Sequence, residues 1–307
     1  MTVARRFHHS HVLVGASFVL ALSGALGAQD LMLPNQKDSV HFAVIGDSGT
    51  GGSKQYKIAE RLAAIRARFP FDFVLMLGDN LYGGSGPRDY TNKFEKPYKT
   101  LLNAGVKFYA TLGNHDNSNE RFYKLFNMNG DRFYTFKPPR ASVRFFSLDS
   151  NYMDKEQLVW LEKELANSQS DWKIMFFHHP MYSSGGSHGS DLRLREQLEL
   201  IFLKHGVEVV FAGHDHFYER IKPQKRIQHF VSGGAAKLRR GDIQRGPLTE
   251  KGFDDGYHFM LVEIIGARLH FQVISDLGKT LDSGIVTRQQ RQTNAGTAQP
   301  VVATGRA

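Results

Sequence analysis

Six short apolar runs, separated by amphipathic segments, restrict this chain to a small set of folds. Each run is four to seven residues long, is rich in Val, Ile and Phe, and is bounded by Gly, Asp or Asn. Runs of this length and composition are typical of buried β-strands. They cover residues 40–45, 73–77, 106–112, 143–148, 174–177 and 207–212. Because helical patterns lie between them, the sequence predicts an α/β protein.

Three of the intervening segments carry apolar residues at helical spacing. The first follows Ser53, the second follows Asp154 with Gln157 three positions later, and the third covers residues 194–201. Ser and Asp are favoured at the position before a helix, because their side chains accept a hydrogen bond from the first turn. We therefore predict helices that begin after Ser53 and after Asp154.

The pattern changes after residue 220. Residues 259–265 and 269–274 are predicted to form two antiparallel strands joined at Gly266 and Ala267, and we expect them to belong to a second sheet. Residues 222–251 contain eight Lys or Arg against two acidic residues, which favours a solvated, partly mobile loop, with polyanion binding as the alternative. Residues 288–307 lack aromatic and acidic side chains and are predicted to be a disordered tail.

The N-terminus has the features of a targeting segment. Arg5 and Arg6 precede an apolar run over residues 12–26, and small residues follow at positions 27 and 28. We therefore predict a signal peptide over residues 1–28 and a periplasmic or secreted bacterial protein, with an uncleaved anchor as the alternative. The paired arginines also fit a twin-arginine signal. After signal cleavage we expect no membrane span, because no later stretch approaches 18 apolar residues.

The absence of cysteine limits the kinds of functional site that the chain can contain. The 307 residues contain no Cys, which excludes disulfides, thiolate metal sites and cysteine nucleophiles. Any metal ion must therefore be held by nitrogen or oxygen. The formal net charge of +9 favours anionic partners without identifying one.

Residues of metal-ligand type follow five of the six apolar runs, each at a tight turn. In an open α/β sheet the carboxyl ends of the strands meet in one crevice, so residues distant in sequence can share a site. Carboxylate, amide, phenolate and imidazole donors without sulfur suit iron, manganese or zinc. The strings are GDSG with Asp47, GDNLY with Asp79 and Tyr82, GNHD with Asn114, His115 and Asp116, HHP with His178 and His179, and GHDH with His214 and His216.

These five blocks, in this order, resemble those of the metallophosphoesterases, and within them the small, tartrate-resistant type of purple acid phosphatase. The resemblance covers about residues 40–285 and implies a metallophosphoesterase domain over residues 38–287. The implied fold is a four-layer α/β/β/α sandwich of two mixed sheets, with the site at one rim. The resemblance also implies two metal ions bridged by Asp79. The first would be held by Asp47, Asp79, Tyr82 and His216, and the second by Asp79, Asn114, His178 and His214.

The first site has a feature that separates the subfamilies. Many metallophosphoesterases have a histidine ligand two residues after the first aspartate, where this chain has Gly49, and Tyr82 can replace it. A phenolate is a hard anionic donor, which points to Fe(III) in the first site, with Fe(II), Zn(II) or Mn(II) in the second. The alternative for Tyr82 is a packed aromatic side chain.

The resemblance implies hydrolysis of small phosphate monoesters by attack of a metal-bound hydroxide, with an acidic optimum. His115 and His188 match the histidines that face the substrate, where a histidine can protonate the departing oxygen. A surface histidine is the alternative for His188. We expect His179 to point away from the ligand beside it. Asp116 is expected to orient His115 or a backbone turn, and Asp215 to support a turn or the ligands beside it.

Two other functions are compatible with the sequence. A phosphodiesterase, acting for example on nucleotides, would use the same metal centre with a pocket that admits a second ester arm. A non-catalytic phosphate- or polyanion-binding protein is supported by the basic residues 222–251 alone. No specific nucleic-acid partner is predicted, and the sequence leaves the oligomeric state open.

Overall fold

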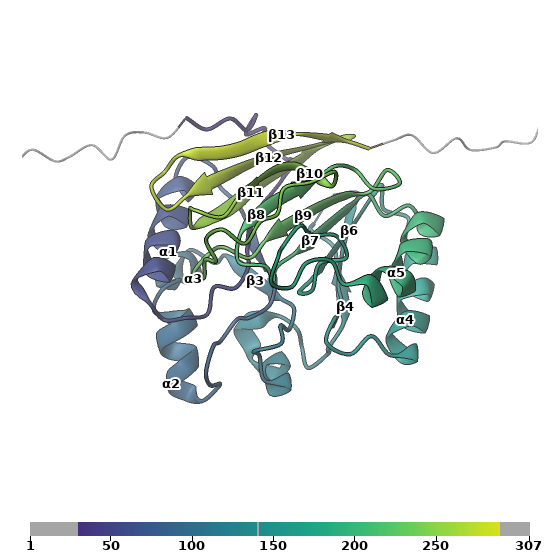
Figure 1. The fold of residues 1–307 in the computed structure, drawn as a ribbon. Coiled ribbons are helices and arrows are strands. Elements are labelled where there is room, and N and C mark those ends of the chain that lie inside the picture. The colour runs from purple at the N-terminus through teal and green to yellow at the C-terminus, as the bar shows by residue number, and fades with distance from the viewer. Residues whose placement is uncertain (1–29, 140, 289–307) are drawn as a thin grey trace, which may run out of the picture.

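The structure is a computed structural model that describes residues 30–139 and 141–288. The predicted signal peptide and residues 289–307 of the predicted tail lie outside the described residues. The described part contains two mixed β-sheets with helices on their outer faces (Figure 1).

The first sheet combines a parallel half with an antiparallel half. Its strand order is β13-β12-β11-β1-β2-β3. The first three strands along the chain run parallel to one another, and β11 pairs antiparallel with β1. The strands are β1 (Val40–Ile45), β2 (Phe73–Met76), β3 (Lys107–Ala110), β11 (His258–Ile265), β12 (Arg268–Ser275) and β13 (Thr280–Thr287).

The second sheet is also mixed, with order β10-β8-β9-β7-β6-β5-β4. Its central strands β5, β6, β7 and β9 are parallel, and β4 and β8 flank them antiparallel. The strands are β4 (Tyr134–Phe136), β5 (Val143–Ser147), β6 (Trp172–Phe177), β7 (Val209–Ala212), β8 (Tyr218–Ile221), β9 (Gln228–Ser232) and β10 (Thr249–Phe253).

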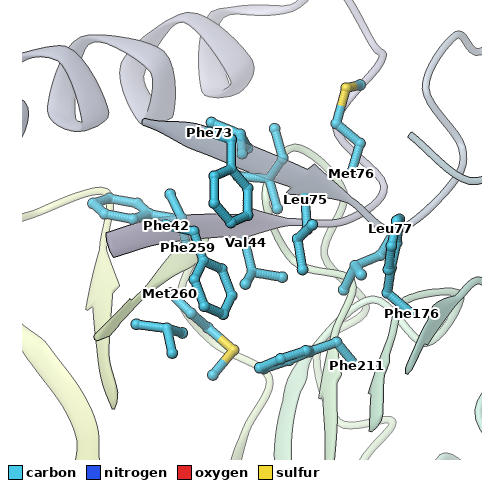
Figure 2. Close-up of a cluster of buried hydrophobic side chains, with 14 of the residues drawn as sticks. Phe42, Val44, Phe73, Leu75, Met76, Leu77, Phe176, Phe211, Phe259 and Met260 are labelled. Carbon is cyan, nitrogen blue, oxygen red and sulfur yellow. The ribbon is translucent and has the colours of Figure 1, made fainter. Parts of the chain in front are cut away.

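The hydrophobic core lies between the two sheets (Figure 2). The Phe42 ring of β1 meets Phe145 of β5 edge-on at 5.2 Å and Phe211 of β7 at 6.1 Å, so aromatic contacts join the two layers. Such offset and edge-to-face pairs stabilise a core beyond the area they bury. Because helices cover the outer faces, strands such as β6 are buried on both sides, which explains why the runs are continuously apolar.

The helices complete four layers. α1 (Ser53–Arg66) lies outside the first sheet, and α4 (Lys155–Ala166) and α5 (Leu192–His205) pack on the outer face of the second (Figure 1). The predicted α/β/β/α sandwich of two mixed sheets is therefore confirmed. Shorter turns of helix occupy the connection from β2 to β4, namely α2 (Pro87–Tyr90), η1 (Thr91–Glu95), α3 (Lys99–Asn103), η2 (Ser118–Phe122) and η3 (Lys124–Phe126). Every helix in the described part of the chain is too short or too polar to span a bilayer.

One predicted helix cap is confirmed and the other is wrong. The Asp154 side chain accepts a hydrogen bond from the backbone N–H of Gln157, as expected. Ser53, in contrast, is the first residue of α1, and the capping position is Gly52, which has no side chain to accept one. The backbone N–H of Gly52 instead donates to the Thr50 hydroxyl, so the preceding turn closes this end of the helix.

Two expectations about the second half of the chain are wrong. The hairpin of β11 and β12 does not build the second sheet, because β11 pairs with the free edge of β1 and extends the first sheet. Residues 222–251 are not a single solvated loop either. They contain β9, whose five residues are all buried, together with most of β10.

Candidate metal centre

The ends of parallel strands from both sheets meet at one rim, and the backbone there is unusual. Asp47 after β1, Asp79 after β2 and His214 after β7 have φ angles of 56°, 52° and 69°. Side chains other than glycine rarely adopt this left-handed region, and such positions cluster at functional sites. The sharp turns let the side chains of three separate strands face one point.

The first cluster of donor atoms consists of Asp47, Asp79, Tyr82 and His216. One oxygen or nitrogen from each of the two aspartates and the histidine lies within 4.8 Å of the others. The Tyr82 hydroxyl lies 3.2 Å from Asp47 Oδ1 and 3.4 Å from His216 Nε2. The four residues predicted to hold the first ion are therefore brought together.

Gly49 explains why the tyrosine is needed in this cluster. A Cβ atom at position 49 would lie 1.8 Å from the backbone oxygen of Asn80. No side chain fits there without moving the turn that carries Asp79, so a histidine ligand at this position is sterically excluded. Tyr82 comes from the next strand end, and its hydroxyl points at Asp47.

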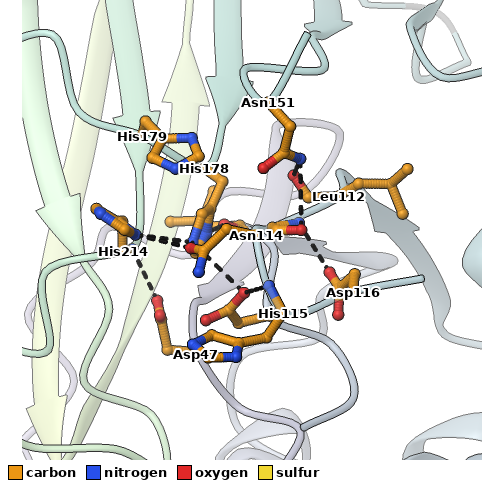
Figure 3. Close-up of polar contacts among 12 residues, drawn as sticks. Asp47, Leu112, Asn114, His115, Asp116, Asn151, His178, His179 and His214 are labelled. Atoms are coloured by element: carbon orange, nitrogen blue, oxygen red, sulfur yellow. Dashed lines mark hydrogen bonds and ion pairs between the residues drawn. The ribbon is translucent and has the colours of Figure 1, made fainter. Parts of the chain in front are cut away.

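The second cluster consists of Asn114, His178 and His214, next to Asp79. The side-chain oxygen of Asn114 lies 2.9 Å from His178 Nε2 and 3.0 Å from His214 Nδ1 (Figure 3). His178 Nε2 is also 3.5 Å from Asp79 Oδ1. Since Asp79 contributes to both clusters, it occupies the position of a bridging carboxylate.

Hydrogen bonds outside the clusters orient the donor groups. His178 Nδ1 donates to the backbone oxygen of Leu77 over 2.8 Å, which leaves the lone pair of Nε2 directed at Asn114 and Asp79. The Asn151 amide donates to the backbone oxygens of Leu112 and Gly113, 3.2 and 3.3 Å away, and so holds the loop that carries Asn114. The donor atoms are thus fixed by the protein itself.

The pKa shifts of the donor groups favour bound cations in the clusters. Burial and the neighbouring Asp79 charge raise the pKa of Asp47, and burial with both aspartates raises that of Tyr82. Burial alone would raise the pKa of Asp79 too, but the His178 charge and hydrogen bonds from Tyr82 and His115 lower it. Burial lowers the pKa of His178 to about 4. Two cations at this place would lower the pKa of Asp47 and Tyr82, and they would also favour the ionised form of Asp79 and the neutral form of His178. The donor set therefore fits a pair of metal ions.

The two histidines predicted to face the substrate flank the clusters. His115 is exposed, its backbone N–H donates to Asp79 Oδ1 over 3.0 Å, and its ring lies 4.9 Å from that of Tyr82. His188 is also exposed, and its ring lies 4.3 Å from that of His214. Both therefore stand at the solvent side of the centre.

His179 is placed differently from the prediction. Its ring lies 4.4 Å from that of His214, and one ring nitrogen falls within 4.8 Å of donor atoms of His178 and His214. The expectation that it points away is wrong, because the chain has left β6 at this position and no longer alternates faces. Ser150, after β5, orients the ring through a 2.9 Å hydrogen bond to Nδ1.

The two aspartates assigned to turns are in turns. Asp116 accepts hydrogen bonds from the backbone N–H groups of Leu81 and Gly113, at 3.0 and 2.8 Å. Asp215 accepts one from the Ser183 hydroxyl, which ties the loop that carries His188 to the turn between the two ligand histidines.

Sequence reasoning missed two cations near the first cluster. The Lys237 ammonium lies 4.2 Å from the centre of the Tyr82 ring, and the backbone N–H of Arg239 donates to the backbone oxygen of His216. A signal was present. The string QHFVSGG resembles the other strand ends, with a short apolar run followed by a glycine turn, but no metal-ligand residue follows the run.

Comparison with known proteins agrees with this geometry. The calcineurin-like phosphoesterase family model matches residues 40–218. Purple acid phosphatase 17 of Arabidopsis thaliana is 27% identical, over 89% of this chain and 91% of its own length. Tartrate-resistant acid phosphatase type 5 of Homo sapiens is 26% identical, over 86% of this chain and 97% of its own.

Solved structures share the fold. GAP50, described as the anchor in the inner membrane complex of Plasmodium, superposes with a TM-score of 0.74 at 19% identity over 84% of this chain and 91% of its own. A purple acid phosphatase from yellow lupin seeds superposes with a TM-score of 0.68 at 18% identity over 84% of this chain and 55% of its own. The resemblance to metallophosphoesterases is confirmed, and the chain belongs to the calcineurin-like phosphoesterase family.

Proposed function

We propose that this protein is a phosphatase with a dinuclear metal centre that hydrolyses small phosphate monoesters. The observation that carries the proposal is the pair of donor clusters that share Asp79 and have His115 and His188 on their solvent side. The acid phosphatase relatives support the same activity.

The residues divide the work of holding the ions. Asp47, Tyr82 and His216 would hold Fe(III), and Asn114, His178 and His214 would hold Fe(II), Zn(II) or Mn(II), with Asp79 between them. Two adjacent ions neutralise charge on the phosphoryl oxygens and lower the pKa of bound water, which is the chemistry that phosphate ester hydrolysis requires. The ligand hydrogen bonds to backbone, such as that from His178 to Leu77, keep the donor atoms in place during this process.

His115 and His188 supply the proton that the departing alkoxide needs. Both side chains are exposed and lie beside the clusters on different loops, so either would present an imidazole on the side from which a substrate enters. Protonation of a leaving oxygen by a positioned histidine contributes typically 10²–10⁴-fold to a rate.

A cleft of about 650 Å³ lies beside the second cluster and is lined by Asn114, Asn151, Tyr152 and His179 among others. It can receive the organic part of a monoester, and it also offers room for the second arm of a diester. Initial rates on 4-nitrophenyl phosphate and bis(4-nitrophenyl) phosphate separate these substrates. A rate on the diester at or above that on the monoester would replace phosphatase by phosphodiesterase in the proposal.

The test combines metal analysis with the visible spectrum. We expect about two ions per chain and an absorption band from phenolate bound to Fe(III), and we expect the band to disappear in Tyr82→Phe. Tyr90→Phe is the matched control, because Tyr90 stacks on Tyr123 at 4.0 Å rather than on a donor cluster. The band should be unchanged in that variant.

Two results would count against the proposal. A colourless, fully active manganese enzyme would contradict the iron assignment and leave a different branch of the family. Metal-loaded protein that binds phosphate but hydrolyses no phosphate ester would favour the non-catalytic alternative.

A further inference from the structure

The loop after β9 reaches the metal centre for the same topological reason as the predicted ligands. β9 runs parallel to β7, so its carboxyl end lies at the rim that carries His214 and His216. Residues 233–240, here called the β9 loop, follow directly. This segment belongs to the basic stretch that the sequence identified and that the proposed function does not use.

Close packing fixes the β9 loop against the first cluster. A Cβ atom at Gly233 would lie 2.3 Å from the backbone oxygen of Asp215 and 2.7 Å from Asp47 Oδ2. The backbone N–H of Ala235 donates to Gly46 over 3.2 Å, and that of Arg239 donates to His216 over 3.1 Å. The loop is therefore bound to the turns that carry two of the ligands.

Two cationic side chains of this loop stand beside the centre with spare hydrogen-bonding capacity. Lys237 and Arg239 are half-buried, and the Lys237 ammonium lies 4.2 Å from the centre of the Tyr82 ring. Arg239 Nη1 lies 3.9 Å from Asp242 Oδ2, too far for a hydrogen bond. Among the described residues this nitrogen has no hydrogen-bond partner, although it is buried.

The Lys237 ammonium and the backbone of Arg239 therefore border the first cluster, on the side of Tyr82 and His216.

We propose that Lys237 and Arg239 form a second anion subsite that favours substrates with two neighbouring phosphates over simple monoesters. The inference rests on the proposed function and names its substrate class. In the proposed function the ions and the two histidines would serve the reacting phosphoryl group, so two further cations on one side match a second anionic group. An arginine side chain binds phosphate oxygens through parallel N–H groups, and lysine adds a point charge.

Hydrolysis of such a substrate requires no reactant other than water. The bond between the terminal phosphorus and the bridging oxygen breaks, and water supplies the oxygen that this phosphorus gains. The remaining phosphate keeps the bridging oxygen and takes up a proton.

Calorimetric titration with stable phosphonates tests the subsite without requiring turnover. Metal-loaded protein is titrated with methylenebisphosphonate, which carries two anionic groups, and with methylphosphonate, which carries one. In Lys237→Gln/Arg239→Gln we expect bisphosphonate affinity to fall by about tenfold or more, as for loss of charge-assisted hydrogen bonds, and methylphosphonate affinity to change by less than about twofold. The single variant Lys237→Arg, which keeps the positive charge, should keep part of the difference in affinity between the two ligands.

Arg240→Gln is the matched control. Arg240 lies in the same loop and is exposed, so the change removes one positive charge away from the clusters, where the double variant removes two beside them. We expect both affinities to stay at the wild-type value. The subsite is wrong if the double variant loses affinity for both ligands equally. It is also wrong if Arg240→Gln lowers bisphosphonate affinity as much as the double variant does, because the cations would then act only through net charge.

The two proposals fail separately. If the wild-type protein hydrolyses esters but the double variant keeps full bisphosphonate preference, the subsite is wrong and the proposed function stands. If the wild-type protein hydrolyses no ester but prefers bisphosphonate through Lys237, the subsite stands and the proposed function is wrong.

Discussion

The two halves of the metal centre differ in their donor atoms. The first cluster places Asp47, Tyr82 and His216 around the shared Asp79, so three of its four groups bind through oxygen. The second places two imidazoles and the amide oxygen of Asn114 beside the same aspartate. With Tyr82 deprotonated, the first half carries three formal negative charges and the second carries only the shared one.

This difference supports our proposal that the two halves bind ions of different charge. Hard anionic oxygen donors favour a trivalent ion, whereas imidazole-rich sites suit divalent iron, zinc or manganese. The surroundings differ as well. Lys237 lies over Tyr82 in the first half, and the open cleft of about 650 Å³ adjoins the second. The shared carboxylate is the one group on which both halves depend.

The largest effect is expected when the shared group is removed. Asp79→Asn keeps the shape of the side chain but removes the bridging charge, so both ions should bind weakly. We expect phosphatase activity to fall by about 10³-fold or more, and metal analysis to find less than one ion per chain. Asp276→Asn is the control, because Asp276 is buried but pairs with Lys57 at 3.2 Å. Two retained ions in Asp79→Asn would show that the carboxylate does not bridge.

Removing one imidazole from each half, in separate variants, should show that the two halves bind their ions independently. His214→Ala should release the divalent ion and leave the visible band, whereas His216→Ala should weaken the band and iron binding. We expect each to lower activity by about 10²-fold, because in the proposed function each ion would neutralise part of the charge on the reacting group. Metal analysis and the spectrum of each variant give the answer. Equal loss of both ions in both variants would mean that the centre has no independent halves.

A smaller effect, on stability rather than chemistry, is expected at Gly49. A Cβ there would lie 1.8 Å from the backbone oxygen of Asn80, so Gly49→Ala must shift the turn that carries Asp79. We expect the free energy of unfolding to fall by about 1–3 kcal/mol, as for overpacking in a closely packed site. Gly52→Ala is the control, since its added Cβ meets Thr50 only at 3.4 Å. Chemical denaturation of both variants, metal-free, measures this. Equal stability would show that position 49 can hold a side chain and would weaken the case for Tyr82.

Much of the fold and of the site could be predicted because the sequence at a strand end shows both where the strand stops and which polar residue lies at the rim. The run before Asp47 reads as a strand since both of its faces are buried, and the polar residue after it has no place in a core. The same reasoning located Asp79, Asn114, His178 and His214, and the structure brings their donor atoms together.

The remainder could not be predicted because it depends on pairing between distant segments. β9 resembles the other strand ends but carries no ligand at its end, so its sequence alone did not link Lys237 and Arg239 to the rim before its parallel pairing with β7 was known. The hairpin of β11 and β12 was placed in the wrong sheet because strand sequences do not specify which free edge they join. His179 was misjudged because alternation of faces holds only inside a strand.

Anomalous X-ray diffraction from crystals of the metal-loaded protein tests the central claim most directly. We expect two peaks, roughly 3.5–4 Å apart as in two-metal sites, with the Asp79 carboxylate touching both and with the iron edge signal on the peak next to Tyr82. One peak, or two peaks that share no ligand, would contradict it.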